Sequence, residues 1–469
     1  LIFAVWLNLL PVSGSGTLVS LSLPAVTVGL GGAGLIARIT RVSMLEVASK
    51  DFIVMLHAKG LGKKAILLKH ILRNALIPVI TILGLRIGWV LGGTVTVEIV
   101  FARPGLGQML ITGLFRRDYP VIQGSMLLLA MGIVLGTFLA DVLYAVTDPR
   151  VRDHHQSPVF SRFCINARMD AKCAIMEAHQ NQESIIPPAN RWIRRVKKIK
   201  SNKAGLLGAF IIAGLILVAL TADLISPYSY KEQDLTMMNS PPSAEHFMGT
   251  DEFGRDVFSR ILHGSRISVY VGVVSVGLSV LLGSLLGAVA GYYGGILDRA
   301  LSLITDLTWS LPEILVALLL VAVVGAGVEC VIIAIALTYW AQYARLIRGQ
   351  ILMLKNEIYV EATRSLGATD FTILFKHLFP NAIAPVIVAA TIGIGQAIVL
   401  EATLGFLGMG AQPPTPSWGA MMSNGTAYLF ISPWVIIFPG LAMMITVFGF
   451  NLFGDVLVDI MDIREDTLK

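Results

Sequence analysis

This chain contains few charged residues. Of its 469 residues only 14% are Asp, Glu, Lys or Arg, 55% are hydrophobic, and the mean hydropathy is +0.74. A soluble domain of this size carries considerably more charge on its surface. The composition therefore argues against a soluble globular protein and predicts a membrane protein.

Cysteine is scarce as well. The three cysteines, Cys164, Cys173 and Cys330, include no close pair, so neither a disulfide scaffold nor a metal framework is expected. The phosphate-binding pattern Gly-x-x-x-x-Gly-Lys-Ser/Thr is also missing, because Gly60-Leu-Gly-Lys-Lys64 has the wrong spacing. We expect no enzyme activity, no metal and no cofactor. Any ATP that drives this protein is then hydrolysed on another polypeptide.

Long apolar stretches dominate what is there. The chain opens without Met or a signal peptide, on Leu1-Ile-Phe-Ala-Val-Trp-Leu, which is typical of the far part of a cut membrane helix. Nine further stretches reach the roughly 20 residues that cross a bilayer. We therefore expect an all-α membrane protein with polytopic transmembrane helices, about nine spans plus a truncated one. The nine lie near residues 18–37, 76–97, 122–146, 204–222, 268–290, 301–325, 328–347, 383–401 and 433–453.

Lys and Arg are distributed unequally between the two sides that these spans define. One side holds 28 of the 36 Lys and Arg, and basic loops stay in the cytoplasm. The C-terminus falls on that side. The basic run from Arg191 to Lys203 directly precedes a span, which favours contact with lipid headgroups over nucleic acid. The segments counted on this side are 38–75, 147–203, 291–300, 342–382 and 454–469.

A polar island at residues 356–385 interrupts the apolar pattern, and the chain is organised around it. Gly367 can take a positive φ and end a first short helix, and Thr369 or Asp370 can cap a second one. Pro380 is expected to end that second helix. One apolar stripe on it, at positions i, i+3, i+4 and i+7, must lie against something. The stripe consists of Phe371, Leu374, Phe375 and Leu378.

The island occurs twice. Moving back 307 residues, from Gly367 to Gly60, matches residues 38–80 to the second copy without a gap. The matched pairs include Lys69 with Lys376 and Asn74 with Asn381. A match of this length is an internal repeat, so two related membrane units are predicted, each with a cytoplasmic island.

The second island resembles the loop of importer permeases of the ATP-binding-cassette class, whose pattern is Glu-Ala-Ala, three residues, then Gly. Glu361-Ala362-Thr363 and Gly367 occupy those positions. In that family the loop forms a coupling helix that docks on the ATPase, and the resemblance implies this role for Glu361, Ala362, Gly367 and the stripe. The first island keeps Gly60 but has Val54-Met-Leu instead of the triplet. Without the resemblance, each island is only an amphipathic pair of cytoplasmic helices.

Longer stretches resemble the two permease subunits of the dipeptide/oligopeptide/nickel subfamily. Residues 190–469 resemble one subunit, on the signature that runs from Pro241 to Arg260, and residues 1–152 resemble the C-terminal part of its partner. The resemblance implies the type I ABC importer permease fold. We expect three parts, namely a truncated first permease unit (1–152), a cytoplasmic linker with a basic pre-membrane segment (153–203), and a complete six-span second unit (204–469).

Ionisable side chains inside spans are costly in lipid, so they mark candidate pathway positions. Arg86, Asp306, Glu313 and Glu401 are such residues. They do not form the register of acids that a proton relay needs. We expect them to face the interior of the helix bundle or to pair across it.

A Gly-bounded stretch on the predicted outer side contains Asp251, Arg255 and Asp256. One interpretation is a turn in which Asp251 or Asp256 caps the helix that leads into the next span. The other is a surface that meets an external binding protein or a partner subunit. The sequence leaves both open.

The resemblance implies the transmembrane permease component of an ATP-binding-cassette importer that moves dipeptides or oligopeptides into the cytoplasm. It implies a multi-pass protein of the bacterial cytoplasmic (inner) membrane. The implied partners are ATPase subunits on the cytoplasmic side, an external substrate-binding protein, a full-length partner permease subunit and membrane lipid. The alternatives are a nickel or other small-solute permease of the same family, an ion-coupled secondary transporter, or a scaffold that does not transport.

Overall fold

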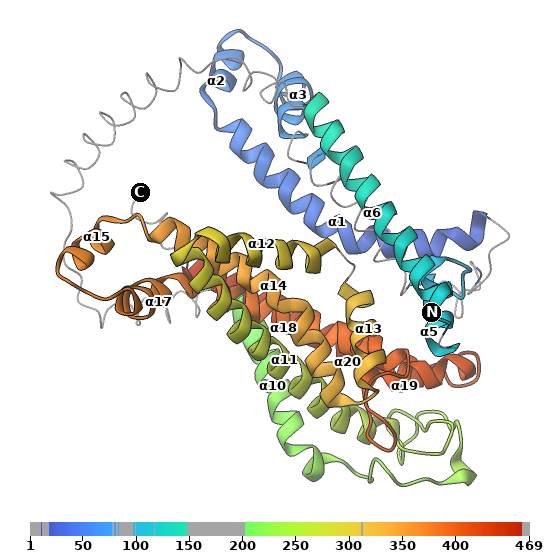
Figure 1. Ribbon diagram of the computed structural model, residues 1–469. Helices are drawn as coiled ribbons and strands as arrows, with labels where there is room; N and C mark the ends of the chain where they lie inside the picture. Colours follow the sequence, from blue (N-terminus) through green and yellow to red (C-terminus); the bar gives the residue numbers. More distant parts are fainter. Residues whose placement is uncertain are drawn as a thin grey trace. The chain divides into compact units, whose positions relative to one another are not determined.

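The structure of the chain is a computed structural model, and it divides into two compact units, Leu1–Pro187 and Pro188–Lys469 (Figure 1). The described part of both units is helical, apart from turns, loops and one isolated β-bridge. The linker predicted at 153–203 lies almost entirely outside the described residues. These are residues 11, 18–76, 79–80, 83, 97–98, 100–116, 118–147, 202–310 and 313–461.

In the described part of the first unit, two helices are long and apolar enough to cross a membrane, α1 and α6. They confirm the spans expected near 18–37 and 122–146. The span expected near 76–97, which contains Arg86, falls mostly on residues that the structure does not describe. The elements are α1 (Leu18–Ala48), α2 (Asp51–Ala58), α3 (Lys63–Ala65), the π-helix η2 (Ile66–Ile71), α5 (Leu106–Arg116) and α6 (Tyr119–Thr147).

The described part of the second unit contains five such helices, which confirm the spans expected near 204–222, 268–290, 328–347, 383–401 and 433–453. Each has a stretch rich in apolar residues that is long enough to cross the bilayer core. The five are α10 (Lys203–Ile225), α11 (Val257–Tyr293), α14 (Val328–Leu354), α18 (Ala384–Phe406) and α20 (Trp434–Met461).

The span expected near 301–325 is not one straight helix. It consists of α12 (Gly295–Ser310) and α13 (Glu313–Val324), which are bent by 92° relative to each other. The sequence predicts a break at this point, because a proline at position 312 has no N–H to continue a helix and its ring would collide with the preceding turn of one. Both helices pack against α14. The described residues thus contain seven candidate spans, or eight if the bent pair crosses as one.

The centre of the second unit is the contact between α11 and α14. Gly283, Gly287 and Gly291 lie four residues apart on one face of α11, and each faces the main chain of α14. Small residues at this spacing let two helices approach closely in a membrane, where no hydrophobic effect drives them together. Helices α10, α18 and α20 pack around this pair.

Candidate functional site

The second island, residues 358–382, is built as the sequence predicts on both sides of its glycine. Helix α15 (Ile358–Ser365) ends before Gly367, whose φ is +83°. Thr369 caps the next helix, because its hydroxyl accepts a hydrogen bond of 3.4 Å from the Thr372 amide. The continuation consists of α16 (Asp370–Thr372), the π-helix η4 (Ile373–Leu378) and α17 (Phe379–Ala382).

Pro380 does not end the second helix, contrary to the prediction. It lies in the first turn of α17, and helical structure continues to Ala382. A proline inside an α-helix would lack one hydrogen bond and collide with the carbonyl four residues earlier. The wider π-helical turn of η4, directly before it, changes that register, so that the chain passes the proline without a break.

The first island, residues 51–75, has the same elements in the same register. Subtracting 307 from the bounds of α15, α16 and η4 gives the bounds of α2, α3 and η2. Gly60 has a φ of +79°, and Asn74 donates to the His70 carbonyl as Asn381 donates to that of His377. Arg73 stands where the second island has Pro380, so the π-helix belongs to the repeat and not to the proline alone.

The predicted apolar stripe is only partly buried. Leu374 and Leu378 are buried, whereas Phe371 is 70% exposed and Phe375 half-buried. The i, i+3, i+4, i+7 spacing assumes 3.6 residues per turn throughout, and the π-helical turns between Ile373 and Leu378 depart from that period. Ile373 takes the buried position instead. The rings of Phe371, Phe375 and Phe379 form a row, with centroids 4.8 Å and 6.1 Å apart.

Most of α15 faces away from the unit. Glu361 and Ala362 are exposed, and Val360 is the buried residue of this helix. Large apolar side chains flank it, with Ile358 70% and Leu366 87% exposed. An apolar surface on an otherwise polar segment indicates a place where another protein docks. The first island likewise exposes Val54, Met55 and Leu68.

Tyr292, in the last turn of α11, ties the second island to the helix bundle, and sequence patterns give no sign of it. Its side chain is buried, and its hydroxyl donates a hydrogen bond of 2.6 Å to Asp370 Oδ1. The Tyr292 hydroxyl oxygen also accepts a hydrogen bond of 3.2 Å from the Arg364 guanidinium. This hydrogen bond raises the pKa of Arg364, which is protonated at any physiological pH in any case. The Lys355 ammonium donates to the Tyr292 carbonyl.

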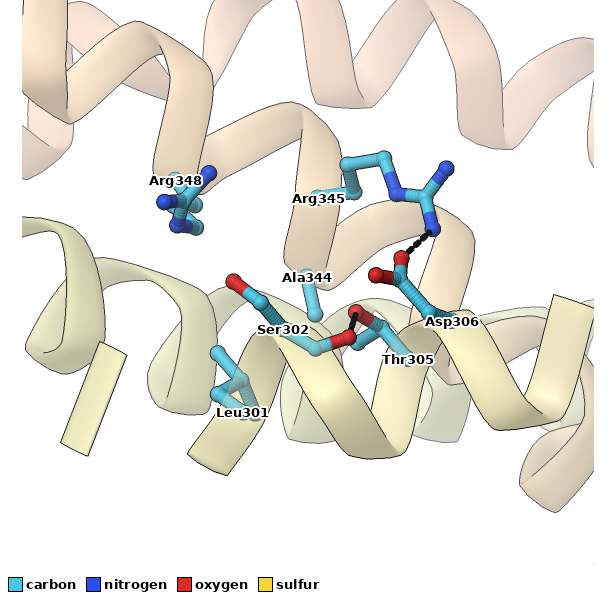
Figure 2. A pocket seen from close by; sticks show the side chains of 7 residues that line it. All are labelled: Leu301, Ser302, Thr305, Asp306, Ala344, Arg345 and Arg348. Carbon is cyan, nitrogen blue, oxygen red and sulfur yellow. Dashed lines mark hydrogen bonds and ion pairs between the residues drawn. The ribbon is translucent and has the colours of Figure 1, made fainter. Parts of the chain in front are cut away.

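Asp306, a predicted pathway residue, pairs with Arg345 of α14 at 2.6 Å and is largely exposed (Figure 2). Two turns earlier in α12, the Asp298 carboxylate forms a bidentate ion pair with the Arg348 guanidinium of α14. A small pocket of about 160 Å³ lies between α12 and α14, and its lining includes Asp306, Arg345 and Arg348. Because both arginines are paired with aspartates, this is a polar seam between two helices.

The other predicted pathway residues lie apart from this seam. Glu401 in α18 is 1% exposed, its Oε2 accepts a hydrogen bond of 3.3 Å from the Ser268 hydroxyl of α11, and its Oε1 has no hydrogen-bond partner among the described residues. It faces the bundle interior, as predicted. Glu313 is the first residue of α13 and is exposed. Arg86 lies outside the described residues.

The outer segment, residues 226–256, buries the three residues predicted there. Asp251, Arg255 and Asp256 are 2%, 6% and 3% exposed, so they are not themselves an exposed surface. Asp256 caps α11, since its carboxylate accepts from the amide and hydroxyl of Ser259. Asp251 holds the turn through Arg255 Nε at 2.7 Å. The turn interpretation is therefore confirmed. The surface interpretation is wrong for these three side chains, because they are buried and their charged groups pair with other groups of the same segment.

Other residues of the outer segment are exposed or fix it to the helices. Asp234 belongs to the same segment, and the hydrogen bonds that its carboxylate accepts from Thr236 lower the pKa of Asp234. The Trp434 indole of α20 donates to the Thr250 carbonyl at 3.1 Å. Phe247 and Leu235 are each 62% exposed. The exposed apolar side chains, and not the buried charges, are what this segment offers to a partner.

Known families match residues in both parts of the chain. The family described as a binding-protein-dependent transport system inner membrane component matches residues 1–153 and 283–466. The family described as the N-terminal TM domain of oligopeptide transport permease C matches residues 190–242.

Individual relatives are about 40% identical. The dipeptide transport system permease protein DppC of Alkalihalophilus pseudofirmus is 40% identical over 283 residues, which are 60% of this chain and 92% of that protein. The oligopeptide transport system permease protein OppC of Bacillus subtilis is 41% identical over 271 residues, 58% of this chain and 89% of that protein. The glutathione transport system permease protein GsiD of Escherichia coli is 42% identical over 272 residues, 58% of this chain and 90% of that protein.

Proposed function

Because the chain belongs to the family of binding-protein-dependent transport system inner membrane components, we propose that it forms the membrane-spanning part of an ATP-driven peptide importer. It is a multi-pass protein of the inner membrane, with helices of the length and hydropathy that a bilayer requires. We infer that it hydrolyses no ATP itself, since its sequence contains no phosphate-binding loop of the Walker type.

One observation carries the proposal, namely the exposed apolar face of the second island. Leu366 at 87% and Phe371 at 70% exposure flank Gly367, which holds the two short helices in an angled pair. Such a face is expensive to leave in water and is buried when a partner binds. We propose that the ATPase subunits bind here, with Glu361 and Ala362 in the contact. The first island keeps Gly60 and exposes other apolar side chains, Val54, Met55 and Leu68, which we propose as the contact with a second ATPase.

Peptides are the proposed substrates. The relatives are named for dipeptides, oligopeptides and glutathione, which share a peptide backbone with charged ends. An external binding protein would deliver them to the side of the outer segment, where Phe247 and Leu235 are exposed. Nickel complexes and other small solutes of this family are the alternative substrates.

The two matched stretches of the family support a chain that holds parts of two permease units. We propose that residues 204–469 form one permease unit, that residues 1–152 are part of a second, and that 153–203 connect them. A full-length permease of the other kind is then the natural partner of the second unit.

Charge substitutions on the exposed face test the proposal. Because Leu366 and Phe371 are mostly exposed, the Leu366→Asp and Phe371→Asp variants should each insert and fold normally but lose co-purification with the cognate ATPase subunits. Phe430→Asp is the control, since Phe430 is 71% exposed in the loop before α20, at the other end of the unit. ATPase recovery that is equal in all three variants would contradict docking at the island.

The energy source is tested by uptake of a labelled dipeptide into vesicles that hold this chain, its ATPases, the binding protein and a full-length partner permease. We expect uptake to require ATP and to survive collapse of the proton gradient. Uptake that persists without ATP but stops with the gradient would favour the ion-coupled transporter.

A further inference from the structure

Tyr292 is the direct polar contact of α11 with both helices of the second island. Arg364 lies in the last turn of α15 and Asp370 opens α16, on either side of Gly367. The Tyr292 hydroxyl bridges them, because it accepts from Arg364 at 3.2 Å and donates to Asp370 at 2.6 Å. Each helix of the island is therefore hydrogen-bonded to the same atom of α11.

Without this hydroxyl the two charges would contribute little to holding the island. Arg364 and Asp370 approach each other only to 3.9 Å, and their side chains are 63% and 57% exposed. An exposed ion pair at that distance is screened by water and salt. The two hydrogen bonds to Tyr292 are charge-assisted, and the tyrosine ring is buried, so the hydroxyl is held in place. The polar link between α11 and both short helices of the island thus runs through the hydroxyl of one buried tyrosine.

Helix α11 reaches from this link to the outer segment. Its 37 residues correspond to about 55 Å of continuous helix. At its beginning Asp256 caps it and accepts a hydrogen bond from His246 of the outer segment at 2.9 Å. Between the two ends its glycine face packs on α14. If the island moves and pulls on Tyr292, the force is therefore applied to α11, whose other end is bound to the outer segment.

From this geometry we propose that Tyr292 is the positioning residue through which movement of the second island is passed to α11 and on to the outer segment. The proposal rests on the proposed function, in which an ATPase moves the island. Docking of the ATPase then uses the exposed apolar side chains of the island, whereas transmission uses the hydroxyl of the buried Tyr292. The two steps can then be separated by substitution.

The test uses the assembled complex with ATPases, binding protein and a full-length partner permease. Tyr292→Phe keeps the ring and removes both hydrogen bonds. Tyr293→Phe is the matched control, because it removes a hydroxyl from the next residue, whose side chain is 58% exposed and touches Tyr292 only through the ring edge. We expect Tyr292→Phe to retain the ATPase but to lose at least about tenfold in dipeptide imported per ATP hydrolysed, since tenfold is the effect of losing only one of the two charge-assisted hydrogen bonds. Tyr293→Phe should match the wild type.

A second variant guards against a local folding defect. Asp370→Asn keeps the shape of the side chain and removes its charge, and it should lower the same ratio in the same direction. If Tyr292→Phe and Tyr293→Phe import equally per ATP, the proposal is overturned while the proposed function stands. If the wild-type complex shows no ATP-driven uptake, the proposed function fails and the proposal fails with it.

Discussion

Gly287 of α11 lies against the main chain of Ala344 in α14, so closely that a Cβ atom on Gly287 would come within 2.2 Å of a well-fixed carbonyl oxygen, that of Ala344. The neighbouring positions repeat this relationship, because Gly283 meets the Trp340 carbonyl and Gly291 the Arg348 carbonyl. Main-chain atoms cannot turn aside as a side chain can. The α11–α14 contact therefore depends on the absence of side chains at these three positions.

Gly287→Ala should separate the two helices and lower the unfolding temperature of the purified protein in detergent. Overpacking of this kind costs about 1 to 3 kcal/mol. Gly277→Ala is the control, since it lies in the same helix with no heavy atom within 4 Å of a Cβ atom. Thermal unfolding followed by size-exclusion chromatography measures both. Equal unfolding temperatures would contradict the close packing.

Gly254→Ala should destabilise the outer segment more than Gly408→Ala does. Both glycines have a positive φ, +70° and +76°, so an alanine carries a similar conformational strain of about 1 kcal/mol at either site. A Cβ atom on Gly254 would also fall 1.7 Å from the Asp234 carbonyl oxygen, whereas Gly408 has open space. The difference between the two unfolding free energies isolates the contact, and a difference near zero would refute it.

Asp298–Arg348 should contribute more than Asp306–Arg345 to the packing of α12 on α14. The first pair is bidentate, with side chains 20% and 29% exposed, and the second has side chains 68% and 40% exposed. Exposed pairs are worth about 0.2 to 1 kcal/mol, and better-shielded bidentate pairs more. Double-mutant cycles to alanine on denaturant unfolding give the two coupling energies. A larger value for the second pair would be the opposite of what we expect.

Ser268→Ala should destabilise the protein by about 1 to 3 kcal/mol, because it removes a hydrogen bond from the buried Glu401 carboxyl. Ser275→Ala serves as control. Ser275 is equally buried on α11, but its hydroxyl has no hydrogen-bond partner among the described residues, so its removal should cost little. Unfolding of both variants in the same detergent decides the matter, and equal losses would show that the Ser268 hydrogen bond contributes nothing.

The repeated island was predictable from the sequence in its main features. Gly60 and Gly367 needed a positive φ, Thr369 carried the side chain of a helix cap, and the match between the copies fixed their register. These are local properties of a few neighbouring residues. The long apolar helices were predictable for the same reason, since length and hydropathy alone decide them.

Errors arose where distant residues or an unusual turn intervened. Phe371 and Leu378 were placed on one stripe on the assumption of an ordinary α-helix, and the structure buries Leu378 and leaves Phe371 exposed. Pro380 was expected to stop a helix that the same turns carry past it. Asp251 and Arg255 were equally good as surface residues until their mutual burial showed otherwise.

By itself, then, the sequence determined the membrane class, the two-fold repeat and the position of each island along the chain, because hydropathy, charge and glycine conformation are encoded within short stretches. Only the tertiary structure decided which side of an island is free and what the other side holds. Tyr292 is separated from Asp370 by 78 residues in sequence and from Arg364 by 72. No local pattern links residues so far apart, since their contact exists only after α11, α14 and the island have packed together.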